Sequence, residues 1–132
     1  MKKLLFILTF LLPLFAAAQT DSTSKNDDDI VFDVVEEAPS YPGGQDSMMS
    51  FIRNNVVYPD SAIKKGLQGK VYVRFIVEKD GTVSNLKAIK EFDKDCTDEA
   101  MRVVRLMKWN PGKQRGKAQR VWMVIPFTFK LK

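Results

Sequence analysis

The stretch VYVRFIVEKDGT, residues 71–82, decides the fold. Its first seven residues are β-branched or aromatic apart from one arginine, which is typical of a strand. Alternation along that strand gives one apolar face, made of Val71, Val73, Phe75 and Val77. Asp80-Gly81 is a two-residue hairpin signal, so we expect the chain to turn back into a second strand, Thr82–Lys90. In that second strand Val83 and Leu86 lie three positions apart, which predicts a bulge.

Two helices are predicted before this hairpin. Asp46 or Ser47 can cap the first, and Asn54-Asn55 ends it. Pro59 suits the start of the second helix, because its missing N–H would have no helical partner there. Gly66 supplies the left-handed residue that follows the last turn.

A longer helix is predicted after the hairpin. Asp95 or Thr97 can cap it, and its apolar stripe consists of Ala100, Val103, Val104 and Met107. Trp109-Asn110-Pro111-Gly112 then breaks the helix. We expect Trp109 to fill the core where this helix meets the sheet.

The last strand is the longest apolar alternation in the chain. One face holds Val121, Met123, Ile125, Phe127, Phe129 and Leu131, and the other holds Trp122, Val124, Pro126, Thr128 and Lys130. A hairpin followed by a helix and a strand favours pairing of the last strand with the first. The sequence therefore predicts an α+β fold with a three-stranded antiparallel sheet, order 2-1-3, and helices packed on one face. Pro126 lacks an N–H, so the last strand should be an exposed edge.

The chain begins with the features of an export signal. Lys2 and Lys3 precede the apolar run Leu4–Phe15, and Ala16-Ala17-Ala18 matches a cleavage site. The 12 positions of that run are fewer than the roughly 20 that a membrane-spanning helix needs, although an uncleaved short anchor remains the alternative. We expect three parts: a signal peptide at residues 1–18, an acidic linker or arm at 19–39, and the folded domain at 40–132 in the periplasm.

The charges are unevenly distributed along the chain. The segment Gln19–Ala38 carries seven acidic residues and one lysine, whereas the rest of the chain beyond it has 18 basic and 9 acidic residues. An exported basic domain is expected to meet acidic receptor segments, anionic lipid or cell-wall polymer rather than nucleic acid. A merely solvated cationic surface is the plainer interpretation.

The residues give no sign of catalysis, metal binding or a cofactor. The chain has no histidine, the usual base of hydrolytic triads and the commonest metal ligand. Cys96 is the only cysteine; its place at a predicted helix start could lower its pKa, but a small buried core residue is the better interpretation. Asp27-Asp28-Asp29 lacks the spacing of a calcium loop. We expect a protein that is not an enzyme and takes no small-molecule substrate.

An open edge in an exported domain can dock an extended peptide as an added strand. The β-prone segment Ile30–Val35 could instead cover that edge, as a strand or extended arm. Trp122, on the less apolar face of the last strand, is either covered by such an arm or part of a binding surface. Both alternatives stay open at the level of the sequence.

The order of these signals resembles the C-terminal domain of TonB, over roughly Ser40 to Lys132. The resemblance depends on landmarks at fixed places between the strands and helices: Tyr58, Pro59, Gly69, Gly81, Trp109, Pro111, Gly112 and Pro126. In that family the domain binds the TonB box, a short segment of outer-membrane TonB-dependent receptors, which adds as a strand beside the domain's last strand.

The resemblance thus implies an energy-transducer domain that supports transport across the outer membrane. It implies a docking edge at Arg120, Val121, Trp122, Met123, Val124, Ile125, Phe127, Thr128, Phe129 and Lys130. A complete TonB also has an uncleaved anchor and a long proline-rich spacer; we expect neither in this protein, and so expect the receptor-binding module alone. The alternative is a non-catalytic structural module that binds cell wall or a neighbouring protein, with its sheet edge occluded.

Overall fold

The computed structural model describes residues 30–132. The expected signal peptide and most of the acidic linker lie outside the described residues. Among residues 30–132, none of the helices has the length and apolar character needed to span a membrane.

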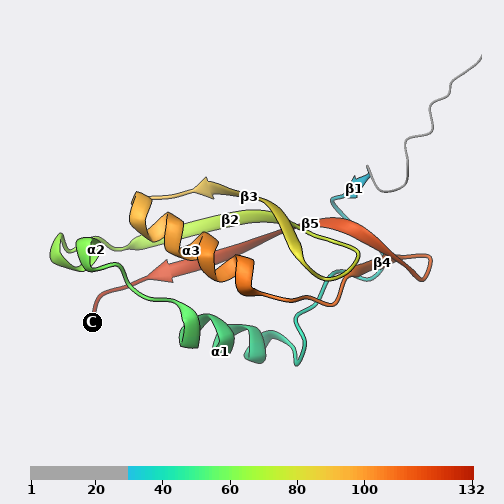
Figure 1. Cartoon of the computed structure of the whole chain (residues 1–132), viewed down its shortest axis with the longest axis horizontal. Helices are drawn as coiled ribbons and strands as arrows, with labels where there is room; N and C mark the ends of the chain where they lie inside the picture. The colour runs from blue at the N-terminus through green and yellow to red at the C-terminus, as the bar shows by residue number, and fades with distance from the viewer. Residues whose placement is uncertain (1–29) are drawn as a thin grey trace, which may run out of the picture.

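Residues 30–132 form five strands and three helices. In order they are β1 (Val31–Phe32), α1 (Gln45–Asn55), α2 (Asp60–Lys64), β2 (Gly69–Val77), β3 (Val83–Lys90), α3 (Lys94–Leu106), β4 (Gly112–Gln114) and β5 (Lys117–Phe129). Figure 1 shows the long strands β2, β3 and β5 side by side, with α3 lying across them and α1 below β5 in this view.

The sheet has the order β1-β5-β2-β3, and β4 pairs with β5 as well. The central strand β2 is antiparallel to both neighbours, with Val73 opposite Ala88 on β3 and Ile125 on β5. This confirms the predicted α+β fold and the predicted order of the three long strands. The prediction of only three strands, antiparallel throughout, was wrong, because β1 runs parallel to β5 and β4 adds a short hairpin.

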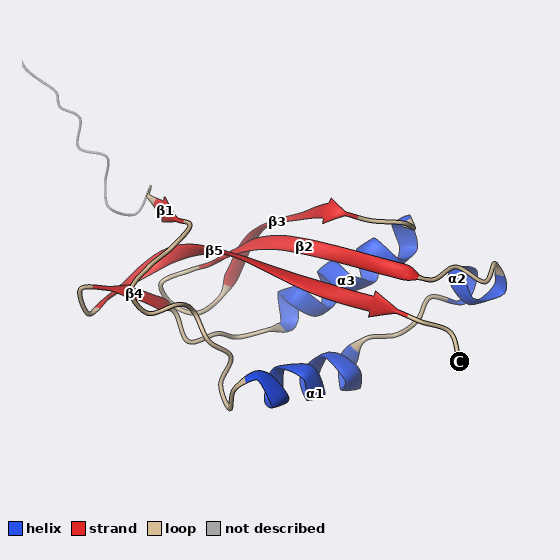
Figure 2. Cartoon of the chain, turned by 180° about the vertical axis from the view of Figure 1, so that it is seen from behind, coloured by secondary structure: helices blue, strands red, loops and turns tan. Residues whose placement is uncertain are grey.

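The core lies between the sheet and the helices. All four predicted core residues of β2, from Val71 to Val77, are fully buried, as are Ala100, Val103 and Val104 of α3. Figure 2 shows α3 behind β2, whereas α1 lies beyond β5, and α3 also contacts β3. Helices therefore cover one face of the sheet, as predicted.

The capping residues differ from those expected. Asp93 caps α3 and accepts a hydrogen bond from the Cys96 N–H at 3.0 Å. The predicted cap Asp95 lies inside the first turn, and Thr97 is buried. Gly44 precedes α1 without a side-chain cap, because the helix begins at Gln45, one residue before the predicted cap Asp46.

The hairpin between β2 and β3 has a three-residue loop instead of the predicted two. The Glu78 N–H donates to the Thr82 carbonyl at 2.8 Å, so residues 79–81 form the loop. Gly81 is in the left-handed region, with φ 85°, as such loops require. The predicted bulge in the second strand is present, because the register shifts where Asn85 has φ 52°.

Candidate functional site

Strand β5 has one fully paired side and one side that is only partly covered. Its paired side meets β2 along the whole stretch from Val121 to Phe129. β5 also pairs with β1 at Arg120 and Val121, and with β4 at its first residues, Lys117–Gln119. From Trp122 to Phe129 no second strand of residues 30–132 pairs with β5.

The position of Pro126 indicates which backbone groups of β5 face this free side. Tyr72 of β2 pairs with Pro126, and the β2–β5 register runs without a shift. In an antiparallel ladder each residue directs its N–H and C=O to the same side, and these directions alternate along the strand. Because Pro126 has no N–H to give to β2, its backbone belongs on the free side. The N–H groups of Trp122, Val124 and Thr128 then face the free side as well.

The two faces of β5 differ as the alternation predicts. Val121, Ile125, Phe127 and Phe129 are buried, and the last three belong to the core that the helices share. On the opposite face Thr128 and Lys130 are exposed, and Val124 is 44% exposed. A strand added at the free edge would therefore have a helix-covered side and a solvent-facing side.

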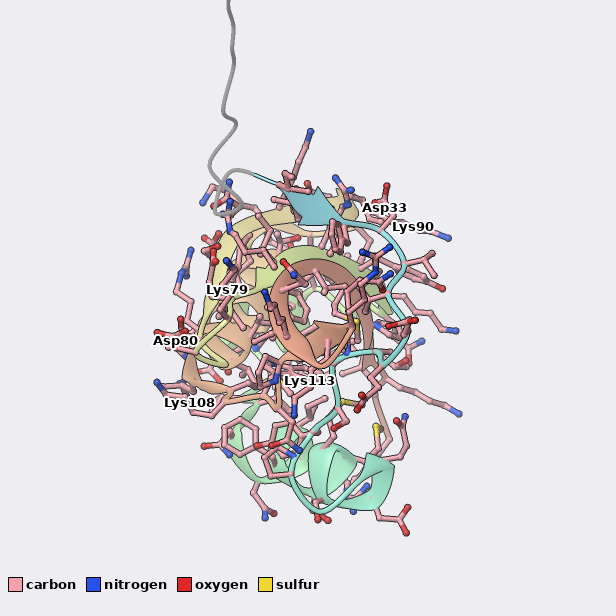
Figure 3. The ribbon with its side chains drawn as sticks, turned by 90° about the vertical axis from the view of Figure 1, so that its right-hand side faces the viewer. Asp33, Lys79, Asp80, Lys90, Lys108 and Lys113 are labelled. Carbon is pink, nitrogen blue, oxygen red and sulfur yellow. The ribbon has the colours of Figure 1, made fainter. Side chains whose placement is uncertain are left out.

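The N-terminal arm, residues 30–40, fixes one end of the free edge. After β1 the arm bonds to β4, where the Glu37 N–H donates to the Lys113 carbonyl at 3.0 Å. Two further backbone bonds join Ser40 to Asn110, at 3.1 and 2.8 Å. Figure 3 shows the arm running from Asp33 past the β4 hairpin that carries Lys113 and on toward α1. The segment predicted as an arm thus covers only the first part of β5.

Trp122 is held in a charged stack at the start of the free edge. The Arg74 guanidinium lies 3.7 Å from the centre of its ring, a cation–π contact. Arg74 also lies 3.6 Å from a carboxylate oxygen of Asp33 in the arm. The contacts of this stack could not be predicted from the sequence, because its members come from three separate segments.

The side chain of Arg120 joins β5 to the end of β2 through an ion pair with Glu78. Its guanidinium makes two bonds to the Glu78 carboxylate, at 2.7 and 3.1 Å. Arg120 holds the pKa of Glu78 below its usual value. Of the residues predicted for docking, Arg120 and Val121 therefore already pair with β1, and Arg120 also binds Glu78. The other predicted residues, from Trp122 to Lys130, have no such strand partner on the free side within residues 30–132.

Several of the predicted landmarks make close structural contacts. The hydroxyl of Tyr58 donates to the Leu67 carbonyl, and its ring lies 5.5 Å from that of Phe129. Gly81 lies so close to Trp109 that a Cβ would come 2.2 Å from its carbonyl oxygen. A Cβ on Gly69 would meet the ring of Phe92 at 2.7 Å. These residues keep the two ends of the sheet closely packed.

Cys96 is a core residue. It is fully buried, and burial raises the pKa of its thiol to about 12. The alternative of a pKa lowered by the helix start is therefore wrong. No group of His, Cys, Asp or Glu within residues 30–132 is arranged to hold a metal ion.

The comparisons with known proteins agree with the geometry. The family model "Gram-negative bacterial TonB protein C-terminal" matches residues 54–131. Protein tonB2 of Pseudomonas aeruginosa is 31% identical over 75 residues, which are 56% of this chain and 28% of that protein. The chain therefore spans less than a third of the length of this curated relative.

A solved structure of Helicobacter pylori TonB-CTD shares the fold. The solution structure of Helicobacter pylori TonB-CTD superposes with a TM-score of 0.52 at 24% identity, covering 65% of this chain and 91% of that one. The solution structure of Pseudomonas aeruginosa TonB CTD has a TM-score of 0.49 at 24% identity, covering 58% of this chain and 79% of that one. The family match spans more than half of the described fold, including every strand of the central sheet except β1. The chain belongs to the TonB C-terminal domain family.

Proposed function

We propose that this protein is a periplasmic energy-transducer domain that binds the TonB box of outer-membrane TonB-dependent receptors by β-strand addition. The membership of the TonB C-terminal domain family supports interaction with such receptors in general. Transport across the outer membrane would be the process that it serves. The domain acts by binding and has no catalytic role.

The unpaired stretch Trp122–Phe129 of β5 is the observation that carries the proposal. An added strand bonds through its backbone to a sheet edge that still has free donors and acceptors. The geometry around Pro126 assigns three N–H groups to this side, those of Trp122, Val124 and Thr128. The docking edge is therefore narrower than the sequence implied, and it begins after the two residues that β1 covers.

The charge of the surroundings favours an acidic partner segment. Lys70 of β2 pairs with Thr128 of β5, and both are exposed. Lys130 continues β5 and is exposed as well. Cations beside the edge attract the acidic positions of an approaching peptide and increase its rate of association.

The second candidate is a non-catalytic structural module that binds cell wall or a neighbouring protein. The pairing of β1 with Arg120 and Val121 favours it, because the arm already occupies the first part of the edge. If the arm moved further along β5, the edge would be closed to receptors. The two candidates differ in whether Trp122–Phe129 accepts a free peptide.

A nuclear magnetic resonance titration distinguishes them. The exported form of the chain, labelled with 15N, is titrated with a synthetic peptide from the TonB box of a receptor of the same bacterium. The proposal predicts shifts concentrated at Trp122–Phe129, with smaller changes in β2. Shifts confined to the helices, or no shift at millimolar peptide, would support the structural module.

Proline variants test the backbone mode of binding. Val124→Pro removes an N–H on the free side, so it should weaken peptide binding about five- to tenfold while the domain stays folded. Thr128→Ala leaves the backbone unchanged and should bind the peptide as the original domain does. Equal effects of the two variants would show that side chains, and not the backbone, hold the peptide.

A further inference from the structure

A pocket of about 310 Å³ opens beside the free edge. Tyr41, Met48 and Trp109 contribute its apolar wall, and residues 123–126 of β5 form the side next to the edge. In Figure 2 α1 lies beyond β5 rather than directly beneath the centre of the sheet, and residues of both elements line the pocket.

The pocket has the size and chemistry for one large apolar side chain. Its volume is about twice that of the ~150 Å³ cavity that holds benzene in other proteins. None of its lining residues carries a charge. A charged side chain would lose its hydration there without gaining a partner, so an apolar group is favoured.

We infer that this pocket receives an aromatic or long aliphatic side chain of the peptide that docks on β5, and so selects among receptor segments. The inference rests on the proposed function. A strand added to β5 lies about 4.8 Å from it, and every second side chain points to the helix side of the sheet. The pocket lies on that side, between Met123–Pro126 and α1.

The outer wall comes from a part of the chain that the family match does not include. Pro39, Tyr41 and Met48 all precede residue 54, where the match begins. This wall is fixed to the domain by the two backbone bonds between Ser40 and Asn110 and by the Tyr41 ring, 5.5 Å from that of Trp109. The segment before the matched domain thus gives this protein its own peptide preference.

Trp109 carries an unused hydrogen-bond donor at this site. Its indole N–H is buried and has no acceptor within residues 30–132. A buried donor without a partner costs free energy, so a native protein seldom keeps one without a reason. The donor belongs to a residue of the pocket wall, so a backbone carbonyl of the docked peptide could serve as its acceptor while the apolar side chain fills the pocket.

A positional peptide series tests the inference. The parent is a synthetic ten-residue peptide of valine and threonine with one glutamate and a central alanine. In each further peptide one position is replaced by phenylalanine, and dissociation constants are measured by tryptophan fluorescence and by shifts in β5. The peptide with phenylalanine at one particular position should bind about tenfold more tightly than the parent, because its ring is transferred from water into the pocket.

Two variants of α1 provide the control. Gln45 is exposed and lines the pocket, so Gln45→Trp should fill its mouth and remove the preference while the parent peptide binds as before. Met49 is 40% exposed on the same helix and does not line the pocket, so Met49→Trp should keep the preference. Nuclear Overhauser contacts from the peptide ring to the methyl groups of Met48 and Met123 give a readout that needs no variant.

The outcomes separate this inference from the proposed function. If the parent shifts β5 but no phenylalanine position improves binding more than twofold, the pocket plays no part and the docking edge stands. A preference that survives in Gln45→Trp, without ring contacts to Met48 or Met123, also overturns the inference. If no peptide of the series, nor the receptor peptide, shifts β5, the proposed function itself fails.

Discussion

Replacing Trp109 with alanine should strongly destabilise the domain. The side chain is only 6% exposed. Its ring lies 5.5 Å from that of Tyr41 and 5.7 Å from that of Phe75, so it joins the loop before α1 to the central strand. Its backbone N–H also donates to the Gly81 carbonyl at 2.9 Å, and that bond remains in the variant.

The expected cost follows from the cavity that the ring leaves. Truncation of a buried large aromatic side chain costs about 3–5 kcal/mol. For a domain of this size each kcal/mol lowers the melting temperature by roughly 4–8 °C, so the midpoint should fall by at least about 12 °C. A small domain has only about 5–15 kcal/mol of stability in total, so the variant is close to unfolding at body temperature.

Trp122→Ala is the matched control, because it removes the same side chain from the open face. That ring is partly exposed and mainly supports the Arg74 guanidinium, a contact of about 1 kcal/mol. Thermal melts followed by far-UV circular dichroism, with urea titrations at 25 °C, measure both variants. Equal shifts for the two variants, or a shift below about 4 °C for Trp109→Ala, would refute the packing described above.

Three further predictions concern charge, backbone and the thiol. Arg120 lowers the pKa of Glu78, so the pair stabilises the fold fully at pH values above the ordinary carboxyl pKa of about 4.3. This stabilisation is lost as the pH falls through the lowered pKa, so Glu78→Gln should flatten the fall in melting temperature between pH 7 and pH 3. Gly81→Ala should lower the urea midpoint more than Gly116→Ala. Both glycines have φ in the left-handed region, where a side chain costs about 1–2 kcal/mol, but only at Gly81 would the added Cβ also meet a backbone oxygen. Burial raises the pKa of the Cys96 thiol to about 12, so its reaction with a disulfide reagent at pH 8 should proceed at the rate of unfolding, and a faster reaction would contradict its burial.

The long elements could be predicted from the sequence because each repeats one pattern over many residues. The alternation in β2 and β5 and the stripe of α3 give the three-stranded order, and Pro126 marks the last strand as an edge. The burial of Trp109 follows from its place at a helix end. These features depend on local periodicity and backbone chemistry, which a single sequence displays.

Of the short elements, β1 lies within the segment Ile30–Val35 that the sequence marks as a strand or arm, but β4 and the exact pairing of both strands could not be predicted, because they depend on distant partners. β1 has two residues and β4 has three, too few to show alternation. The bond between Glu37 and Lys113 joins segments far apart in the sequence, and so does the stack of Asp33, Arg74 and Trp122. The extent of the free edge and the pocket beside it are therefore properties of the tertiary structure.

The pairing of β2 on both sides has a consequence for the order of folding. Val73 finds its partner on β3, Ala88, only 15 residues away, but its partner on β5, Ile125, is 52 residues away. Closing the longer loop costs more chain entropy, and distant pairings form late. The hairpin and α3 can therefore assemble first, and β5 joins them last. The edge proposed for docking exists only once the whole domain has folded, so any substitution that unfolds the core abolishes binding without touching the edge itself.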